Sequence, residues 1–260
     1  MKIAHESPLS IFDRVQELTD YDYALVHLFE ENEEYYNKFK QAVTSGREVI
    51  LDNSIFELGT AFSGEAYAKW VEKLLPEWYI IPDVLDDGEA TIDSYYDFIE
   101  DVCGLPGKAI AVAQGKDYND LVECYKFFDN QPLVQKIAIS FDYPWLQKLA
   151  GGNKYERMMY GRQYVLRRML TDGVINTDKP HHLLGCGLPQ EFRAYRDMDW
   201  IDSVDTSNPV VHGILGIEYE VGGLYNKESA KLFTMIEEEV LDKMDIIEYN
   251  IDMFRKFCNG

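Results

Sequence analysis

Four polar residues that could carry acid–base and recognition chemistry each follow a short apolar run. Asp52, Asp83, Gln114 and Asp205 are widely separated along the chain. A carboxylate can act as a nucleophile or as a general acid or base, whereas an amide can both donate and accept hydrogen bonds. Carboxylates at the end of a buried strand are costly unless something pairs with them or uses them. We therefore expect a functional role for these residues, with capping of the next turn as the structural alternative.

Short apolar runs alternate with amphipathic helical patterns along the whole chain. The predicted strands are residues 2–5, 23–29, 48–52, 78–83, 108–114, 136–140, 181–187 and 200–205. The predicted helices are residues 9–18, 31–44, 64–75, 89–102, 117–129 and 153–171, with a short helix from Pro189 and an acidic helical segment over about 228–260. Eight strands with intervening helices predict an α/β fold, a (β/α)8 TIM barrel with a C-terminal helical extension. No linker or repeat interrupts the pattern, so residues 1–260 are expected to form a single domain.

The barrel prediction gives the separated polar residues a common location. In a (β/α)8 barrel the chemistry lies at the carboxyl ends of the strands. Asp52, Asp83, Gln114, Asp142 and Asp205 all fall at or just after predicted strand ends. We therefore expect several acids and an amide to lie at one rim.

Composition limits the classes of protein that fit. The 260 residues are 46% hydrophobic, enough for a large core, and no apolar run approaches the roughly 20 residues of a membrane helix. The first residues lack the apolar stretch of a secretory signal. The cysteines Cys103, Cys124, Cys186 and Cys258 form no C-x-x-C pair or zinc knuckle. These features predict a reduced, cytoplasmic protein without a membrane partner.

The net charge of -21, from 46 acids and 25 bases, opposes non-specific attraction to nucleic acid. A nucleic-acid substrate would therefore need a local basic surface. Residues 154–168 carry five basic residues and one acid in a predicted helix, which makes this helix the candidate. A solvated helix face is the alternative.

Five segments, in order, resemble the tRNA-guanine transglycosylase superfamily, which includes members that insert 7-deazaguanine bases into DNA. Residues 51–57 (Leu-Asp-Asn-Ser-Ile-Phe-Glu) resemble its Asp-Ser-Gly-Gly-Phe-Gln segment, and Pro82-Asp83 lies where the family places an acid that reads the base. Residues 111–115 are similar to Ile-Val-Gln-Gly, and residues 182–187 (His-Leu-Leu-Gly-Cys-Gly) to His-Leu-Met-Gly-Val-Gly. Residues 201–209 resemble the segment that bears the nucleophilic aspartate.

The chain also departs from that family. Ser54-Ile55 replaces a Gly-Gly pair, the Thr-Arg after the nucleophile segment is missing, and the cysteine-rich zinc site of the tRNA enzymes is absent. These departures favour DNA over tRNA as the substrate. They fit a compact, divergent member of the kind that viruses carry, acting in an infected host cell.

The resemblance implies a role for each matched residue. Asp205 would be the nucleophile that attacks C1′ of the sugar, with Asp202 as its rival because the segment can be matched in either register. The two side chains point to opposite faces of a regular strand, so one alone should reach the site. Asp52 would be the general acid/base. Asp83 would accept hydrogen bonds from N1–H and the exocyclic amine of a guanine-like edge, and Gln114 would contact O6.

Glycines and aromatics complete the expected site. Gly185 and Gly187 would let a base approach the backbone, or simply permit a tight turn. Phe56, Phe141 and Tyr143 are candidates for stacking on a base, with core packing as the alternative. The adjacent histidines before Cys186 supply too few ligands for a metal, so we expect no metal site. We also expect no cofactor, because the glycine-rich nucleotide-binding patterns are absent.

Three functions remain open at this point. The first is an enzyme of the pentosyltransferase class that replaces guanine in nucleic acid by a 7-deazaguanine through a covalent aspartyl-glycosyl intermediate. The second is a glycosidase or N-glycosidase that uses the same carboxylates. The third is a catalytically retired, acidic binding protein. The expected partners are a 7-deazaguanine base and a nucleic acid, with an accessory protein as a further alternative for the source of specificity.

Overall fold

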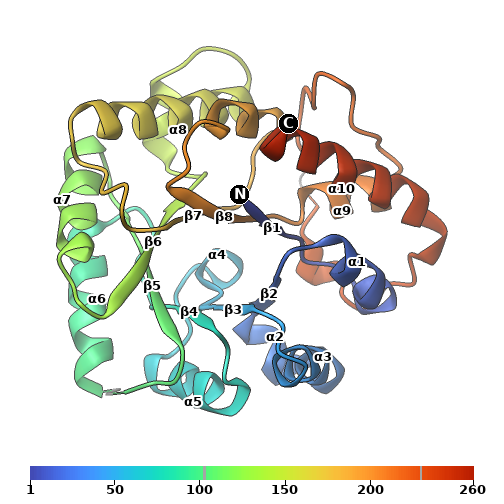
Figure 1. Cartoon of the computed structure of the whole chain (residues 1–260), viewed down its shortest axis with the longest axis horizontal. Coiled ribbons are helices and arrows are strands. Elements are labelled where there is room, and N and C mark those ends of the chain that lie inside the picture. Colours follow the sequence, from blue (N-terminus) through green and yellow to red (C-terminus); the bar gives the residue numbers. More distant parts are fainter. Residues whose placement is uncertain (102–103, 229) are drawn as a thin grey trace. The chain divides into compact units, whose positions relative to one another are not determined.

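The computed structural model describes residues 1–101, 104–228 and 230–260. Within these residues, eight strands form one parallel sheet in the order β1-β8-β7-β6-β5-β4-β3-β2. From β2 to β8, strands that follow one another in the chain are neighbours in the sheet, with helices between them, and β1 pairs with β8, so the predicted (β/α)8 barrel class is confirmed (Figure 1). The strands are β1 (Lys2–Ala4), β2 (Asp22–Leu25), β3 (Val49–Asp52), β4 (Trp78–Ile80), β5 (Lys108–Val112), β6 (Val134–Ser140), β7 (His181–Leu184) and β8 (Ile201–Asp205).

The helices lie between the strands and after the last one. The α-helices are α1 (Phe12–Leu18), α2 (Val26–Glu31), α3 (Glu33–Thr44), α4 (Ile55–Leu58), α5 (Gly64–Leu74), α6 (Gly88–Asp101), α7 (Tyr118–Asp129), α8 (Lys154–Thr171), α9 (Asn208–Ile214) and α10 (Met244–Asn259). Short 3-10 turns are η1 (Leu9–Ile11), η2 (Pro144–Lys148), η3 (Pro189–Tyr195), η4 (Leu232–Met235) and η5 (Leu241–Lys243).

The chain divides into two compact units. The first unit comprises Met1–Asp20, Phe141–Asp172 and Leu183–Gly260, and the second comprises Tyr21–Ser140 and Gly173–His182. That the whole chain behaves as a single domain stays a prediction.

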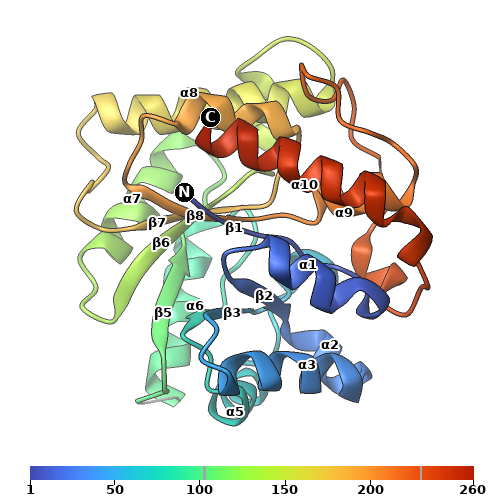
Figure 2. The ribbon, with the colours of Figure 1, turned by 45° about the vertical axis from the view of Figure 1, so that its right-hand side comes forward.

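The second unit is built on β2 to β6. Their apolar residues are buried, and Val49, Ile50 and Leu51 of β3 have no exposed surface. The Tyr67 hydroxyl of α5 donates to the Leu51 carbonyl at 2.8 Å and accepts from the Ile80 N–H at 3.1 Å, which ties α5 to β3 and β4. Helices α6 and α7 pack against each other, as Figure 1 and Figure 2 both show.

The first unit is built on the parallel pair β1 and β8, in which Ala4 is opposite Asp205. Helix α10 packs against α9 and η3 (Figure 2). Helix α8 approaches η2 closely at Gly161, where an added Cβ would lie 2.7 Å from the Leu146 side chain. A capping box begins α8, because Asn153 accepts from the Glu156 N–H while the Glu156 carboxylate accepts from the Asn153 N–H.

The predicted strand over residues 23–29 is wrong in its second half. Strand β2 pairs with β3 only from Asp22 to Leu25, and the chain then turns into α2. Val26, His27, Leu28 and Phe29 are all buried, so the first turn of this short helix has no exposed polar side. Periodicity alone does not separate such a helix from a strand.

The acidic segment over 228–260 is not one helix. Only α10 and two 3-10 turns form there in the described residues. Between the turns, the Ile236 carbonyl accepts from the Leu9 N–H at 2.9 Å, and the Glu238 carbonyl accepts from the Ser10 hydroxyl at 2.7 Å. These backbone carbonyls thus accept hydrogen bonds from Leu9 and Ser10, whereas in a continuous helix they would accept from N–H groups of the same helix.

The cysteines and the helices of the described residues bear on two of the sequence predictions. Cys124, Cys186 and Cys258 are free and buried, while Cys103 and the predicted helical position Val102 lie outside the described residues. No helix in the described part of the chain combines the length and the apolar character that a bilayer span needs.

Candidate functional site

Asp83, Asn53 and Gln114 form a hydrogen-bonded cluster in the second unit, just beyond β4, β3 and β5. Asn53 Nδ2 donates to Asp83 Oδ1 at 2.7 Å and to the Ile81 carbonyl at 3.0 Å. Gln114 Nε2 donates to Asp83 Oδ2 at 2.7 Å, and its Oε1 accepts from the Asp86 N–H at 3.2 Å. The three side chains of the cluster are buried. The structure therefore brings Asp83 and Gln114 together and adds Asn53, which sequence reasoning missed.

The Asp83 carboxyl group has an unusual protonation equilibrium. Burial raises its pKa from the ordinary 3.8 to about 6, while the hydrogen bonds from Gln114 and Asn53 oppose this rise. Two neutral amides thus stabilise the ionised form. Near neutral pH the group is a buried carboxylate whose ionisation destabilises the folded chain.

The cluster has hydrogen-bonding capacity beyond its internal bonds. A carboxylate offers about four lone-pair positions, and Asn53, Gln114 and the backbone N–H of Asp83 itself use three of them. The carboxylate therefore keeps capacity for a further donor, such as the N1–H or the exocyclic amine of a guanine-like edge. The second N–H of the Gln114 amide can donate to an oxygen such as O6.

Asp52, the last residue of β3, is half-buried and caps the turn that follows it. Its Oδ1 accepts from the Ser54 N–H at 2.5 Å, and its Oδ2 accepts from the Tyr23 hydroxyl of β2 at 2.6 Å. Ser54 has a φ of 59°, a left-handed conformation that the capping bond supports. Asp52 thus caps the turn after β3, which is the structural alternative named above. An acid–base role for Asp52 stays a prediction.

The three aromatic stacking candidates differ in exposure. Phe56, in α4, is 50% exposed. Phe141 and Tyr143 are buried, and the Tyr143 ring stacks on Trp145 with centroids 6.0 Å apart. Core packing therefore accounts for Phe141 and Tyr143, while Phe56 retains a ring accessible to a ligand.

Asp205 ends β8 in the first unit and is buried. Its Oδ1 accepts from the Gly185 N–H at 3.3 Å, which links the ends of β7 and β8. Asp202 lies earlier in β8 and is half-buried. Because successive side chains alternate along a strand, the two acids project from opposite faces. Asp205, and not Asp202, lies at the carboxyl end of the strand.

Gly185 and Gly187 differ in what they require. Gly185 has a φ of 63°, and an added Cβ would lie 2.5 Å from the Phe141 ring. At Gly187 an added Cβ would meet nothing closer than 3.7 Å. The turn itself therefore explains Gly185, whereas no contact in the described residues explains Gly187.

A buried ion pair holds the end of β7. Arg162 Nε donates to Glu191 Oε1 at 2.6 Å, and both side chains are only 1% exposed. The other guanidinium nitrogens donate to the carbonyls of Leu184 at 2.9 Å and Gly185 at 3.1 Å, and the Tyr195 hydroxyl donates to Glu191 Oε1 at 2.6 Å. Arg162 thus fixes the carbonyl of the residue whose N–H meets Asp205. Five basic residues on the predicted helix suggested a nucleic-acid surface, but Arg162 is not part of any surface.

Lys227 is a second residue that sequence reasoning missed. Its Nζ donates to the Cys186 carbonyl at 2.9 Å and lies 4.6 Å from the centroid of the Phe141 ring. Burial lowers its pKa, and it interacts electrostatically with Asp142, whose pKa burial raises. The residue falls in an irregular segment after α9, so no periodic pattern drew attention to it.

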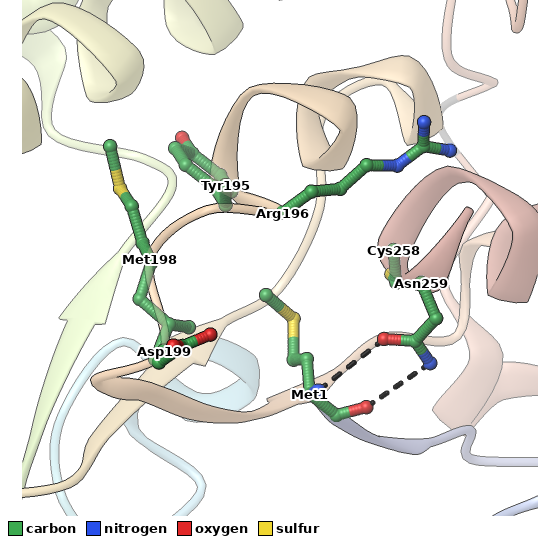
Figure 3. A pocket seen from close by; sticks show the side chains of 8 residues that line it. Met1, Tyr195, Arg196, Met198, Asp199, Cys258 and Asn259 are labelled. Atoms are coloured by element: carbon green, nitrogen blue, oxygen red, sulfur yellow. Dashed lines mark hydrogen bonds between the residues drawn. The ribbon is translucent and has the colours of Figure 1, made fainter.

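Two cavities lie away from the predicted site residues. In the first unit, a cavity of about 160 Å³ is lined by Arg196, Asp199 and the start of β8, and Asn259 exchanges two hydrogen bonds of 3.3 Å with Met1 there (Figure 3). In the second unit, a cavity of about 530 Å³ is lined mainly by acids of α6 and α7. Neither cavity is lined by a predicted site residue.

The described residues contain no group of three or more His, Cys, Asp or Glu side chains arranged to hold a metal ion. Comparison with protein-family models and with curated proteins found no match. The candidate site in the second unit is therefore the hydrogen-bonded cluster around Asp83, and the first unit carries a strand-end carboxylate, Asp205.

Proposed function

We propose that this protein is a pentosyltransferase that replaces guanine in nucleic acid, DNA rather than tRNA, by a 7-deazaguanine. The observation that carries the proposal is the buried Asp83 carboxylate held by the Asn53 and Gln114 amides. It combines two acceptors with an adjacent donor, which is the complement of a guanine edge. The resemblance in motif order supports the same reading, and the buried free cysteines fit a reduced, cytoplasmic setting.

The chemistry divides into two displacements. A carboxylate oxygen of Asp205 attacks C1′ of the nucleoside, the C1′–N9 bond breaks, and its electron pair remains on the departing guanine, which takes a proton from Asp52. The incoming 7-deazaguanine then loses its N9 proton to Asp52 and attacks C1′, which releases the Asp205 carboxylate. The covalent ester between these steps divides one difficult substitution into two easier ones.

The test uses DNA that carries radiolabelled guanine, incubated with the protein and with preQ0 or preQ1 as the 7-deazaguanine. Exchange predicts label release that depends on the added base, with the 7-deazaguanine recovered in the DNA. Release without any added base would instead support hydrolysis by the same carboxylates. No release under any condition, with binding retained, would favour the acidic binding protein.

Variants then assign the residues. Asp205→Ala should abolish both label release and the covalent adduct with DNA, whereas the matched variant Asp202→Ala should retain them. Asp83→Asn keeps the size of the side chain but replaces an acceptor by a donor, so it should weaken use of guanine-type bases. If Asp202→Ala removes the adduct and Asp205→Ala does not, the assignment of the nucleophile is wrong.

A further inference from the structure

The outer face of α8 combines arginines and tyrosines at helical spacing. Tyr160 is 49% exposed and Tyr164 is 51% exposed, one turn apart. Arg157, Arg167 and Arg168 fall on the same face, because residues three, four, seven and about eleven apart align along a helix. We call Arg157, Tyr160, Tyr164, Arg167 and Arg168 the Arg–Tyr face.

The opposite face of α8 accounts for the rest of the helix. The buried apolar residues of this face are Met158, Met159, Val165, Leu166 and Met169. Arg162 donates its hydrogen bonds to Glu191 and to two backbone carbonyls. The basic character of the sequence segment is therefore divided between a buried structural arginine and the Arg–Tyr face, on which Arg167 and Arg168 are exposed and Arg157 is half-buried. About half of each tyrosine on this face is exposed.

Arg167 keeps donors for a ligand. It donates one hydrogen bond to the Ala194 carbonyl at 3.2 Å, while Arg168 lies 3.5 Å from the Asp172 carboxylate. A guanidinium has five N–H donors, so the Ala194 bond leaves other Arg167 donors for a phosphate. Exposed ion pairs such as Arg168–Asp172 contribute little energy and exchange readily.

The charge of the whole chain restricts what can bind there. With a net charge of -21, most of the surface repels a polyanion, so a phosphate backbone would favour this local basic face. Tyrosine rings flanked by arginines suit unpaired bases, which stack on aromatic faces while their phosphates meet the cations. A duplex hides its base faces and could use only the arginines.

We propose that the Arg–Tyr face of α8 binds single-stranded DNA, with bases stacked on Tyr160 and Tyr164 and phosphates contacted by the arginines. This inference rests on the proposed function in one respect, the choice of DNA as the substrate. It adds that the DNA is bound in a single-stranded state, in which a base is free to leave its stack.

Binding is measured by fluorescence anisotropy with a fluorescein-labelled single strand of mixed DNA sequence, the same sequence as a duplex, and the same sequence as RNA. Tyr160→Ala and Tyr164→Ala should each weaken single-strand binding about fivefold or more. Tyr160→Phe and Tyr164→Phe should preserve it, because the ring is retained. Arg167→Gln should reduce the salt dependence of binding by about one phosphate contact.

Tyr249→Ala is the matched control, because Tyr249 is 41% exposed on α10 of the same unit. It should leave binding unchanged. Unchanged binding by the Tyr160→Ala/Tyr164→Ala double variant would overturn the inference, as would equal loss with Tyr249→Ala, duplex binding as tight as single-strand binding, or tighter binding of the RNA. Single-strand binding that depends on the tyrosines but occurs without base exchange would uphold the inference and refute the proposed function.

Discussion

Replacing Arg162 by methionine tests the buried network of the first unit most directly. The guanidinium makes three charge-assisted hydrogen bonds, to Glu191, Leu184 and Gly185, with only 1% of the side chain exposed. Arg162→Met leaves the Glu191 carboxylate buried without its cation, a change that typically costs about 3–5 kcal/mol. We expect a loss of this size in the free energy of unfolding, measured by urea denaturation.

The double variant Arg162→Met/Glu191→Leu separates the cost of an uncompensated charge from the loss of packing. It removes both charges, so it should be more stable than Arg162→Met alone by about 1–3 kcal/mol. The Leu184 and Gly185 carbonyls and the Tyr195 hydroxyl still lose partners, so wild-type stability should not be recovered in full. Additive losses from the two single substitutions would refute the coupling of this pair.

The same network has a functional consequence under the proposed function. Arg162 fixes the Gly185 carbonyl, and the Gly185 N–H donates to Asp205. Arg162→Lys keeps the charge but cannot reproduce the planar fork that contacts a carboxylate and two carbonyls at once. We expect slower formation of the Asp205 adduct with little change in the KM for DNA. A rise in KM with an unchanged kcat would contradict a positioning role.

Three further outcomes can be checked by denaturation. Asp83 binds its proton more tightly in the folded chain, with a pKa of about 6 against an ordinary 3.8. Its contribution to the free energy of unfolding should therefore fall by roughly 3 kcal/mol as pH rises from about 4 to about 6. Subtracting the Asp83→Asn stability profile from the wild-type profile isolates this pH dependence, and a difference that does not change with pH would contradict the assigned burial. Gly185→Ala should lower stability by about 1–3 kcal/mol, because its methyl group meets the Phe141 ring and its φ is positive, whereas Gly187→Ala should change thermal stability little. Asn153→Ala should cost about 1 kcal/mol through loss of the α8 capping box, and an unchanged unfolding midpoint would show that tertiary packing alone holds this helix end.

Most elements of the fold could be predicted because their local signals agree with their tertiary setting. Helix α3 begins after Asn32, whose side chain accepts from the Tyr35 N–H, and α7 begins after Asp117 in the same way. Strand β3 is a short apolar run that is buried on both sides, as parallel strands in barrels are. The count and order of such runs were sufficient for the fold class.

The errors arise where tertiary contacts override the local pattern. The apolar run after Leu25 continues without a break, and only the end of the β2–β3 pairing shows where the strand stops. The segment from Ile236 to Val240 contains helix-forming glutamates, but its backbone bonds to residues near Ser10. Neither partner is visible in the local sequence.

The candidate site shows the same division. Asp83 and Gln114 could be identified because each follows a strand, but Asn53 was passed over beside Asp52, since adjacent residues on a chain leave open which side chain turns inward. The structure resolves this choice, because Asn53 is buried against Asp83 while Asp52 is half-buried and bonded to Tyr23. Arg162 was assigned to a surface because its helix is basic, and only its contact with Glu191 shows otherwise.

The two buried acids of these networks differ in a way that bears on function. Glu191 is compensated by a cation, as expected for a carboxylate retained to hold structure. Asp83 is compensated by two neutral amides, and its raised pKa shows that burial outweighs them. An asparagine could join the same amides without a buried charge, so structure alone gives little reason for a carboxylate there. Titratable groups with such shifted pKa values are concentrated at functional sites, and a ligand N–H donor would further stabilise the ionised form of Asp83.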